Sequence, residues 1–167
     1  MNPLSITLFA STLAVLSVSP VFADTMAPAP ATQGIAADEG VIRVKSAYGV
    51  AETIARLKAD IASKGIKFFD EIDQTKLAAD AGITLNPSTL LVFGNPPLGI
   101  QFLTSNPYAG LDWPVRMLVL QDASGQVWIA YTDFTYIAHR HHITDRDAQF
   151  AMATMVAGSI ASAAQAK

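Results

Sequence analysis

An unbroken apolar run in the middle of the chain most constrains the fold. Residues Thr89 to Phe93 read TLLVF, and they lie between two turn-forming segments, Asn86-Pro87 and Gly94-Asn95-Pro96. A run of this length between proline turns is typical of a central β-strand that is buried on both faces. The chain therefore needs a sheet, and it needs other elements to cover that sheet.

Four further segments have strand patterns. Val41 to Ala47 alternates apolar and polar residues, as expected of a strand with one solvated face. Ile66 to Ile72 predicts a second strand. Val115 to Leu120 and Gln126 to Thr132 flank the sequence Asp122-Ala-Ser-Gly125, which predicts a hairpin with glycine at the residue that needs a positive φ.

Helical periodicity is clearest after Gly49, which can cap the helix. Val50, Ile54, Leu57 and Ile61 fall on one stripe, and Gly65 supplies a left-handed stop. Shorter helices are expected elsewhere, and Thr144 with Asp147 forms a capping box that opens a C-terminal helix to about Ala164. The shorter helices span Thr75–Ala81, Pro97–Leu103 and Asp133–His141.

Because strands and helices do not alternate as repeated βα units, the order of elements predicts an α+β fold. We expect an antiparallel or mixed sheet packed by helices on one face. The C-terminal helix is rich in small residues, so it either covers the sheet or meets a second subunit, and covering the sheet is the default expectation.

Several short motifs occur in order between Thr89 and His141. TLLVFGNP (Thr89–Pro96) is followed by NPYAGLDWP (Asn106–Pro114), Arg116, the hairpin sequence DASGQVW (Asp122–Trp128), Tyr131-x-Asp133 and Arg140-His141. With the capped first helix and Ile72-Asp73, this pattern resembles the domain of unknown function 302 family (DUF 302), from about Val41 to the C-terminus.

The resemblance implies a two-layer α/β sandwich of TATA-binding-protein-like type that pairs as a homodimer, with no established activity or cofactor. Two positions depart from the family pattern. Members commonly have Ile-Asp-His where this chain has Ile72-Asp73-Gln74, and they usually have leucine where Trp113 stands. The missing histidine weakens any family-wide scheme in which it would coordinate a metal or move a proton.

The N-terminus predicts export. Leu4 to Val18 is apolar except for serine and threonine, and Val21 and Ala23 occupy the −3 and −1 positions of a small-residue cleavage site. We expect residues 1–23 to be a signal peptide, removed after Ala23, and the mature protein to be periplasmic. The alternative is a membrane anchor, but a spanning helix needs roughly 20 apolar residues, and this run is shorter and ends in Pro20.

The mature chain is expected to have two parts. Residues 24–40 are rich in alanine and proline and lack periodicity, which predicts a disordered linker. Residues 41–167 are expected to form a single α+β domain. Its core must stabilise it without disulfides, because the chain contains no cysteine.

Charge and missing motifs narrow the function. The net charge of −3 argues against nucleic acid, or an anionic membrane after signal cleavage, as a partner. The absence of cysteine excludes thiol nucleophiles and thiolate metal sites. No hydrolase elbow, zinc-protease motif or phosphate loop is present, so no cofactor is expected and catalysis is disfavoured. Asp70, Glu71 and Asp73 could do acid–base chemistry, but a charged strand edge explains them more simply.

The polar loops beside the central strand are the main candidate site. Asn95 and Asn106 each precede proline, Asp112 follows Gly110-Leu111, and Arg116 lies at the start of the next predicted strand. These side chains could line a groove that presents polar groups to a ligand, with His141 as a fifth member. Alternatively, the asparagines and Asp112 serve turn formation alone, and the two interpretations can coexist.

The three histidines, His139, His141 and His142, are clustered. They suggest a metal site, although two or three imidazoles need a carboxylate such as Asp145 or a second subunit to complete it. If Asp133 caps the preceding helix, His141 points inward, while His139 and His142 lie on the other side. The simpler interpretation is one packed histidine and two exposed ones.

We therefore predict a non-catalytic periplasmic domain that dimerises and binds a small molecule or protein partner through the loops around Asn95 and Asn106. Periplasmic metal binding through the histidines is the alternative. An enzyme of unrecognised type is a third hypothesis, for which His141 beside Asp133 or Tyr131 is the only titrating candidate.

Overall fold

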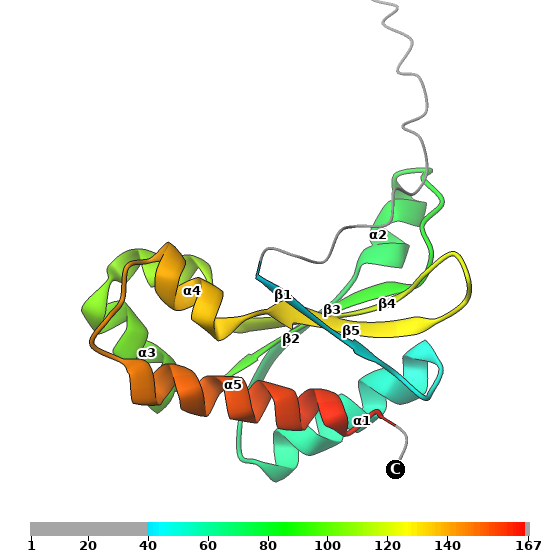
Figure 1. Cartoon of the computed structure of the whole chain (residues 1–167). Coiled ribbons are helices and arrows are strands. Elements are labelled where there is room, and N and C mark those ends of the chain that lie inside the picture. Colours follow the sequence, from blue (N-terminus) through cyan, green and yellow to red (C-terminus); the bar gives the residue numbers. More distant parts are fainter. Residues whose placement is uncertain (1–39, 166–167) are drawn as a thin grey trace, which may run out of the picture. The chain divides into compact units, whose positions relative to one another are not determined.

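A five-stranded antiparallel sheet forms the centre of the fold in residues 40–165, the part of the chain that the computed structural model describes (Figure 1). Along the sheet the strand order is β1-β5-β4-β3-β2. The strands are β1 (Val41–Lys45), β2 (Lys67–Asp73), β3 (Ser88–Gly94), β4 (Val115–Gln121) and β5 (Val127–Thr132). All five predicted strands are confirmed.

The β4–β5 hairpin closes as its sequence predicts. Leu118 pairs with Ala130, and the Asp122 backbone N–H donates to the Gln126 carbonyl at 2.9 Å. Gly125 adopts a φ of 85°, which only glycine tolerates without strain. This hairpin brings β4 to the middle of the sheet, between β5 and β3.

Two long helices, α1 (Val50–Ser63) and α5 (Asp147–Ser162), lie against the same face of the sheet, below the strands in Figure 1. The stripe predicted on α1 faces the sheet, with Leu57 and Ile61 almost fully covered and Val50 and Ile54 half-buried. The core forms where these helices meet the strands, and α5 covers the sheet with its small residues, as expected. The most deeply buried strand residues are Leu91, Phe93, Met117, Val119 and Ile129. The fold is thus α+β, as predicted.

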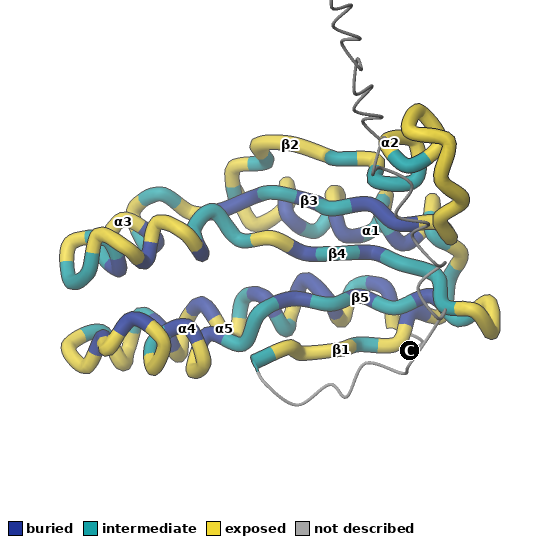
Figure 2. Tube along the Cα trace, turned by 90° about the horizontal axis from the view of Figure 1, so that it is seen from above, coloured by how far each residue is buried: buried dark blue, intermediate teal, exposed yellow. Residues whose placement is uncertain are grey.

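The opposite face of the sheet is less covered than the sequence suggested. Figure 2 looks down on this face, with buried and half-buried residues alternating along the inner strands. Leu90 and Val92 on β3 are only half-buried, so the prediction that this strand is buried on both faces was wrong. Helices pack along one face only, and α2 (Gln74–Asp80) meets β3 near Ser88 at its start.

Several short elements gather at one end of the sheet (Figure 1). α3 (Pro96–Ser105) follows β3 and continues into the 3-10 helix η1 (Pro107–Leu111), while α4 (Phe134–Arg140) follows β5. Asp133 caps α4 as predicted, because its Oδ1 accepts from the Thr135 N–H at 3.0 Å. This end of the fold therefore carries most of the predicted site residues.

The predicted capping box of the last helix is wrong. The helix begins at Asp147 with Arg146 as its N-cap, and no side chain caps it. The Asp145 carboxylate instead accepts from the Ser105 hydroxyl, and Arg146 donates to the Gln101 carbonyl. These contacts hold Asp145 and Arg146 against α3, so the helix begins at Asp147 and not directly after Thr144.

Residues 1–39 lie outside the described residues, and with them the predicted signal peptide and the predicted linker up to Glu39. Within residues 40–165, no helix has the length and apolar character needed to cross a bilayer.

Candidate ligand-binding site

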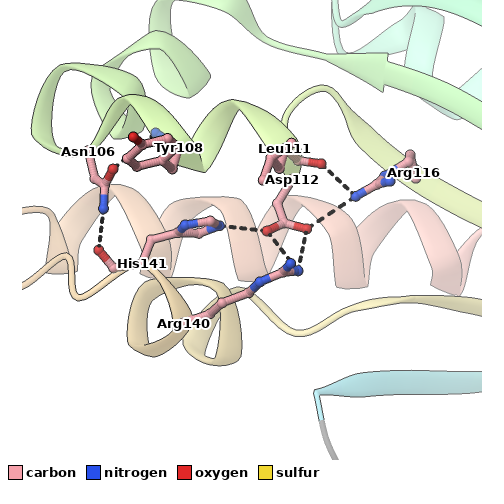
Figure 3. Close-up of polar contacts among 7 residues, drawn as sticks. All are labelled: Asn106, Tyr108, Leu111, Asp112, Arg116, Arg140 and His141. Carbon is pink, nitrogen blue, oxygen red and sulfur yellow. Dashed lines mark hydrogen bonds and ion pairs between the residues drawn. The ribbon is translucent and has the colours of Figure 1, made fainter.

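A buried carboxylate, Asp112, organises the loop that follows η1 (Figure 3). Its side chain is 4 % exposed and lies 2.6 Å from His141 Nε2, which is 6 % exposed. Arg116 Nη2 donates to Asp112 Oδ1 at 3.1 Å and to the Leu111 carbonyl at 2.8 Å. Arg140 Nη1 lies 3.3 Å and 3.4 Å from the two carboxylate oxygens. We call these four side chains, Asp112, Arg116, Arg140 and His141, the Asp112 cluster.

The cluster joins segments that are far apart in the sequence. His141 is the C-cap of α4, and the short helix turns its ring inward beside Ile137, as the sequence predicted. Its partner is Asp112, however, and not Asp133 or Tyr131, which the enzyme hypothesis had named. A buried charge is stable only when it is paired and hydrogen-bonded, and the partners of Asp112 come from β4 and from the C-terminal end of α4.

Asn106 is also tied into this end of the fold. Its Oδ1 accepts from the Tyr108 N–H at 3.0 Å, which caps η1, and its Nδ2 donates to the His141 carbonyl at 2.8 Å. Both ends of the amide are therefore used within the protein. For Asn106, the interpretation as turn chemistry fits the structure.

Asn95 differs from Asn106, although each precedes proline. It is the N-cap of α3, but its side chain makes no cap bond, and it forms no side-chain hydrogen bond to any residue between 40 and 165. The cap geometry comes from the backbone, because the Asn95 carbonyl accepts from the Leu98 and Gly99 N–H groups. The exposed amide is thus available to a ligand.

An apolar pocket opens beside Asn95, between α3, α5 and the end of β3. Its cavity volume is about 40 Å³, and the empty space reaches about 390 Å³ only when the open solvent at its mouth is included. Its wall is formed almost entirely by carbon atoms, among them those of Phe93, Leu98, Phe102 and Val156. We call it the Trp113 pocket, since the Trp113 indole also lines it.

Trp113 sits in a gap that two glycines create. A Cβ added at Gly99 would lie 1.7 Å from Trp113 Nε1, and one added at Gly94 would lie 3.2 Å from the same atom. The indole and the Phe69 ring meet edge-on, with ring centroids 6.1 Å apart. The indole N–H donates to no protein acceptor among residues 40–165, so it is a second unpaired polar group, and its nitrogen lies against Gly99 at the wall of the pocket.

Sequence reasoning identified Asn95 but did not assign Trp113, Gly99 or Arg140 to a site. A signal was present for two of them. Trp113 replaces the leucine usual in the family, and Gly99 lies inside a helix, where a glycine costs stability unless close packing requires it. Arg140 was one of several exposed cations, and nothing in the sequence placed it beside Asp112.

The three histidines do not converge. His141 is buried against Asp112, whereas His139 and His142 are exposed, with ring centroids 6.5 Å apart. Within residues 40–165, no three side chains of the metal-binding types come together. The metal hypothesis therefore has at most two neighbouring imidazoles to build on.

The clearest pKa shifts belong to groups outside the Trp113 pocket. A hydrogen bond from the Ser124 hydroxyl, followed by one from the Trp128 indole, lowers the pKa of Asp122 to about 2. A hydrogen bond from Ser105 lowers the pKa of Asp145, and burial raises the pKa of Tyr131. These groups stabilise turns and the core and lie apart from the pocket lining.

A family model described as "Domain of unknown function DUF302" matches residues 42–163 of the chain. The match therefore covers both long helices, the entire sheet except its first residue, and all the residues of the candidate site.

Curated relatives from Brucella carry a functional name. The chain is 37% identical over 122 residues to "Fluoride-specific ion channel FluC 1" of Brucella suis biovar 1 (strain 1330), which covers 73% of this chain and 48% of the relative. The same identity holds for proteins of Brucella abortus and Brucella melitensis, covering 45% of each. The chain thus spans about half the length of the curated relatives it matches.

Among solved structures, the fold is similar to the crystal structure of an uncharacterized conserved DUF302 protein from Bacillus stearothermophilus. The TM-score is 0.69 at 19% sequence identity, and the match covers 75% of this chain and 98% of the other. At this identity the likeness concerns the fold alone.

Proposed function

The chain belongs to the family of domains of unknown function DUF302, and we propose that this member acts by binding a small, mainly apolar molecule in the Trp113 pocket. The molecule carries at least one polar atom, which meets the Asn95 amide and the Trp113 indole N–H. Binding, and not catalysis, is the function on this proposal.

One observation supports this proposal most strongly: an apolar pocket has two polar groups at its edge that the protein leaves unpaired. Small-molecule sites are typically concave and apolar, with a few polar groups that fix orientation. Unpaired polar groups are costly when covered, so a ligand that fills the pocket has to satisfy them. The pocket therefore favours a ligand with a hydrogen-bond acceptor for the Trp113 indole N–H, or with an amide that pairs with the Asn95 amide.

Two indole N–H groups make the proposal testable by NMR. Trp128 Nε1 already donates to Asp122 Oδ2 at 2.7 Å, whereas Trp113 Nε1 is free. We expect ligands from a thermal-shift screen of small aromatic and aliphatic metabolites to move the Trp113 indole resonance and to leave that of Trp128 unchanged. Ligand binding to the native state also raises the melting temperature.

Asn95→Ala is the variant that tests the pocket, and Asn86→Ala is its matched control. Asn86 also precedes a proline and is exposed, but it does not line the Trp113 pocket. Asn95→Ala should weaken binding about tenfold, the loss expected for one hydrogen bond, while Asn86→Ala should bind normally. Screen hits that bind without moving the Trp113 indole, or that bind Asn95→Ala unchanged, would refute the proposal.

The setting we propose is the periplasm. The N-terminal 23 residues have the composition of a cleavable signal peptide, ending in Ala23. Expression of the full chain in a Gram-negative host should yield, in the periplasmic fraction, a protein whose intact mass begins at Asp24. Full-length protein retained in the cytosol would disprove this part of the proposal.

We also propose that the domain pairs as a homodimer through the open face of the sheet. This face has a centre of half-buried apolar side chains, formed by Leu90, Val92, Leu118, Leu120 and Trp128. In an isologous dimer the same patch of both copies is buried, which removes its apolar surface from water.

Light scattering tests the dimer directly. The mature protein should have twice the monomer mass, and Leu118→Glu should convert it to a folded monomer, because a charge in the centre of an apolar interface is costly. A wild-type protein that is monomeric at all concentrations would exclude this pairing and leave the face to another partner.

A second candidate function follows from the names of the Brucella relatives. These proteins are named fluoride-specific ion channels, and the chain is 37% identical to nearly half of their length. On this alternative, the ligand of the domain is fluoride. A fluoride-selective electrode should then record depletion of free fluoride by the purified domain, and unchanged free fluoride would exclude the candidate.

A further inference from the structure

Arg140 is a cation that the Asp112 cluster holds only loosely. Its Nη1 lies 3.3 Å and 3.4 Å from the carboxylate oxygens, whereas a charge-assisted N–H···O bond is usually about 2.7–2.9 Å long. Asp112 is already paired at 2.6 Å with His141 and at 3.1 Å with Arg116. The carboxylate therefore has closer partners, and Arg140 retains most of its capacity to bind an anion.

The two arginines of the cluster face solvent on their outer sides. The side chains of Arg116 and Arg140 are 49 % and 48 % exposed, while the carboxylate between them is 4 % exposed. A guanidinium has five N–H donors. Among residues 40–165, Arg140 donates from Nη1 alone and Arg116 from Nη2 alone, so the other nitrogens of both side chains have no protein acceptor.

The charge of the cluster is positive as well. Two guanidiniums share one carboxylate, so a net charge of one remains even when His141 is counted as neutral. A small pocket of about 10 Å³ adjoins the cluster, lined by Asp112, Arg116 and Thr132 together with the apolar Val115, Phe134 and Ile137, and Arg140 lies outside its lining. An anion at the exposed sides of the two guanidiniums meets a cationic surface, because the Asp112 side chain itself is only 4 % exposed.

We propose that Arg116 and Arg140 form a binding site for an oxyanion, the carboxylate or phosphate group of a small ligand. The planar fork of a guanidinium matches the spacing of two oxygens on such a group, which a point charge does not. The Leu111 carbonyl at 2.8 Å and Asp112 at 3.1 Å orient Arg116, so part of the ordering cost of binding is already met in the free protein. The pocket beside this site shares Val115 and Phe134 with the Trp113 pocket, but Asn95 and Trp113 line only the latter.

The test is an NMR titration of the purified mature protein with inorganic phosphate and, in a second arm, with malonate, at constant ionic strength. The Nε–H resonances of Arg116 and Arg140 should shift and saturate with at least one of the two anions. Saturation with phosphate, with malonate or with both supports the site and shows whether it binds phosphate groups, carboxylate groups or both. No saturable shift with either anion overturns the proposal.

Three variants distinguish recognition of the anion by the guanidinium fork from attraction by positive charge alone. Arg140→Ala should weaken binding about tenfold, as for the loss of one charged hydrogen bond. Arg140→Lys retains the charge beside Asp112 but lacks the fork, so it should also bind more weakly than wild type. Lys76→Ala removes one cation from an exposed pair with Asp80, far from the cluster in sequence, and should bind normally.

Each variant also has an outcome that contradicts the site. If Arg140→Lys binds phosphate as the wild type does, the fork is not what recognises the anion. If Lys76→Ala weakens binding as much as Arg140→Ala, the attraction is nonspecific. The Asn95→Ala variant should retain phosphate binding, so failure of the proposed apolar-ligand function and failure of this site give different results.

Discussion

Asn95 and Asn106 both precede proline, but their side-chain amides differ in the hydrogen bonds they form within the protein. Both ends of the Asn106 amide are bound within the fold, to the Tyr108 N–H and the His141 carbonyl. The Asn95 amide makes no side-chain hydrogen bond within residues 40–165 and lies at the edge of an apolar pocket. The dipeptide sets the turn in both cases, but only the neighbouring elements decide whether its amide stabilises the fold or remains free for a ligand.

The difference follows from what lies opposite each loop. Asn106 faces the C-terminal end of α4, which presents a carbonyl that needs a donor. Asn95 faces the pocket beside Trp113, whose wall is apolar and provides no partner. The segment from Ser105 to Asp112, which we call the bound region, is therefore held to the rest of the fold by side-chain hydrogen bonds, whereas the Asn95 side chain is not.

The largest expected effect is on Asp112, at the end of the bound region. Asp112→Ala leaves His141 and two arginines without their shared carboxylate, and we expect the free energy of unfolding to fall by on the order of 3 kcal/mol. Urea denaturation of wild type and variant measures the change. Asp80→Ala, which breaks only an exposed pair with Lys76, should cost less than about 0.5 kcal/mol. Equal losses of the free energy of unfolding in the two variants would mean that Asp112 stabilises the fold no more than an exposed ion pair does.

The next effect concerns Asn106 itself. Asn106→Ala removes the cap of η1 and leaves the His141 carbonyl without its donor, so we expect a loss of about 2 kcal/mol. The matched control is Asn86→Ala, a third Asn-Pro position whose side chain makes no bond to residues 40–165. If the melting temperatures of the two variants agree, the assignment of Asn106 to the bound region is wrong.

A smaller effect is expected from acid, and only in the bound region. The pKa of Asp145 is lowered from 3.8, chiefly by the hydrogen bond from Ser105, the residue before Asn106. Because the folded-state pKa is below the unfolded value, the stabilisation is present above pH 3.8 and is lost as pH falls through the folded-state value. The backbone amide of Ser105 should therefore titrate with a midpoint below 3.8, measured by NMR.

Ser105→Ala sharpens this prediction. Without the hydroxyl donor, the midpoint of the Asp145 titration should rise toward 3.8. The pocket lining has no titratable side chain, so the Trp113 indole resonance should stay constant until the protein unfolds globally. A Trp113 shift that follows the Asp145 titration would show that the two regions are coupled.

The smallest effect on stability is expected at Asn95. Since its amide is exposed and makes no bond within the described chain, Asn95→Ala should change the free energy of unfolding by less than about 0.5 kcal/mol. Its consequence is a loss of ligand binding and not of stability. A loss as large as that of Asn106→Ala, measured by urea denaturation, would remove the contrast between the two loops.

Much of the architecture could be predicted because its signals are local. Apolar stripes, capping residues and turn glycines located the helices and strands, and the Asp133 cap and the φ of Gly125 are both as expected. The start of α5 was missed because Thr144 and Asp147 form a local capping pattern, whereas contacts of Asp145 and Arg146 with α3 delay the helix. A contact between segments 40 residues apart leaves no local signal.

In the candidate site, too, only the features with a local signal in the sequence could be predicted. His141 was predicted to point inward, because helical periodicity fixes its side of α4. Its pairing with Asp112, the loose contact of Arg140 and the fit of Trp113 against Gly99 were not predictable, because each joins residues from different elements.

By itself, the sequence determined the class of fold, the positions of the turns and the residue types available at the loops. Tertiary structure alone decided which of those polar groups are bound within the protein and which remain free. The physical reason is that backbone propensity acts over a few neighbouring residues, whereas a hydrogen bond or a pocket depends on which distant segments the packing of the core brings together.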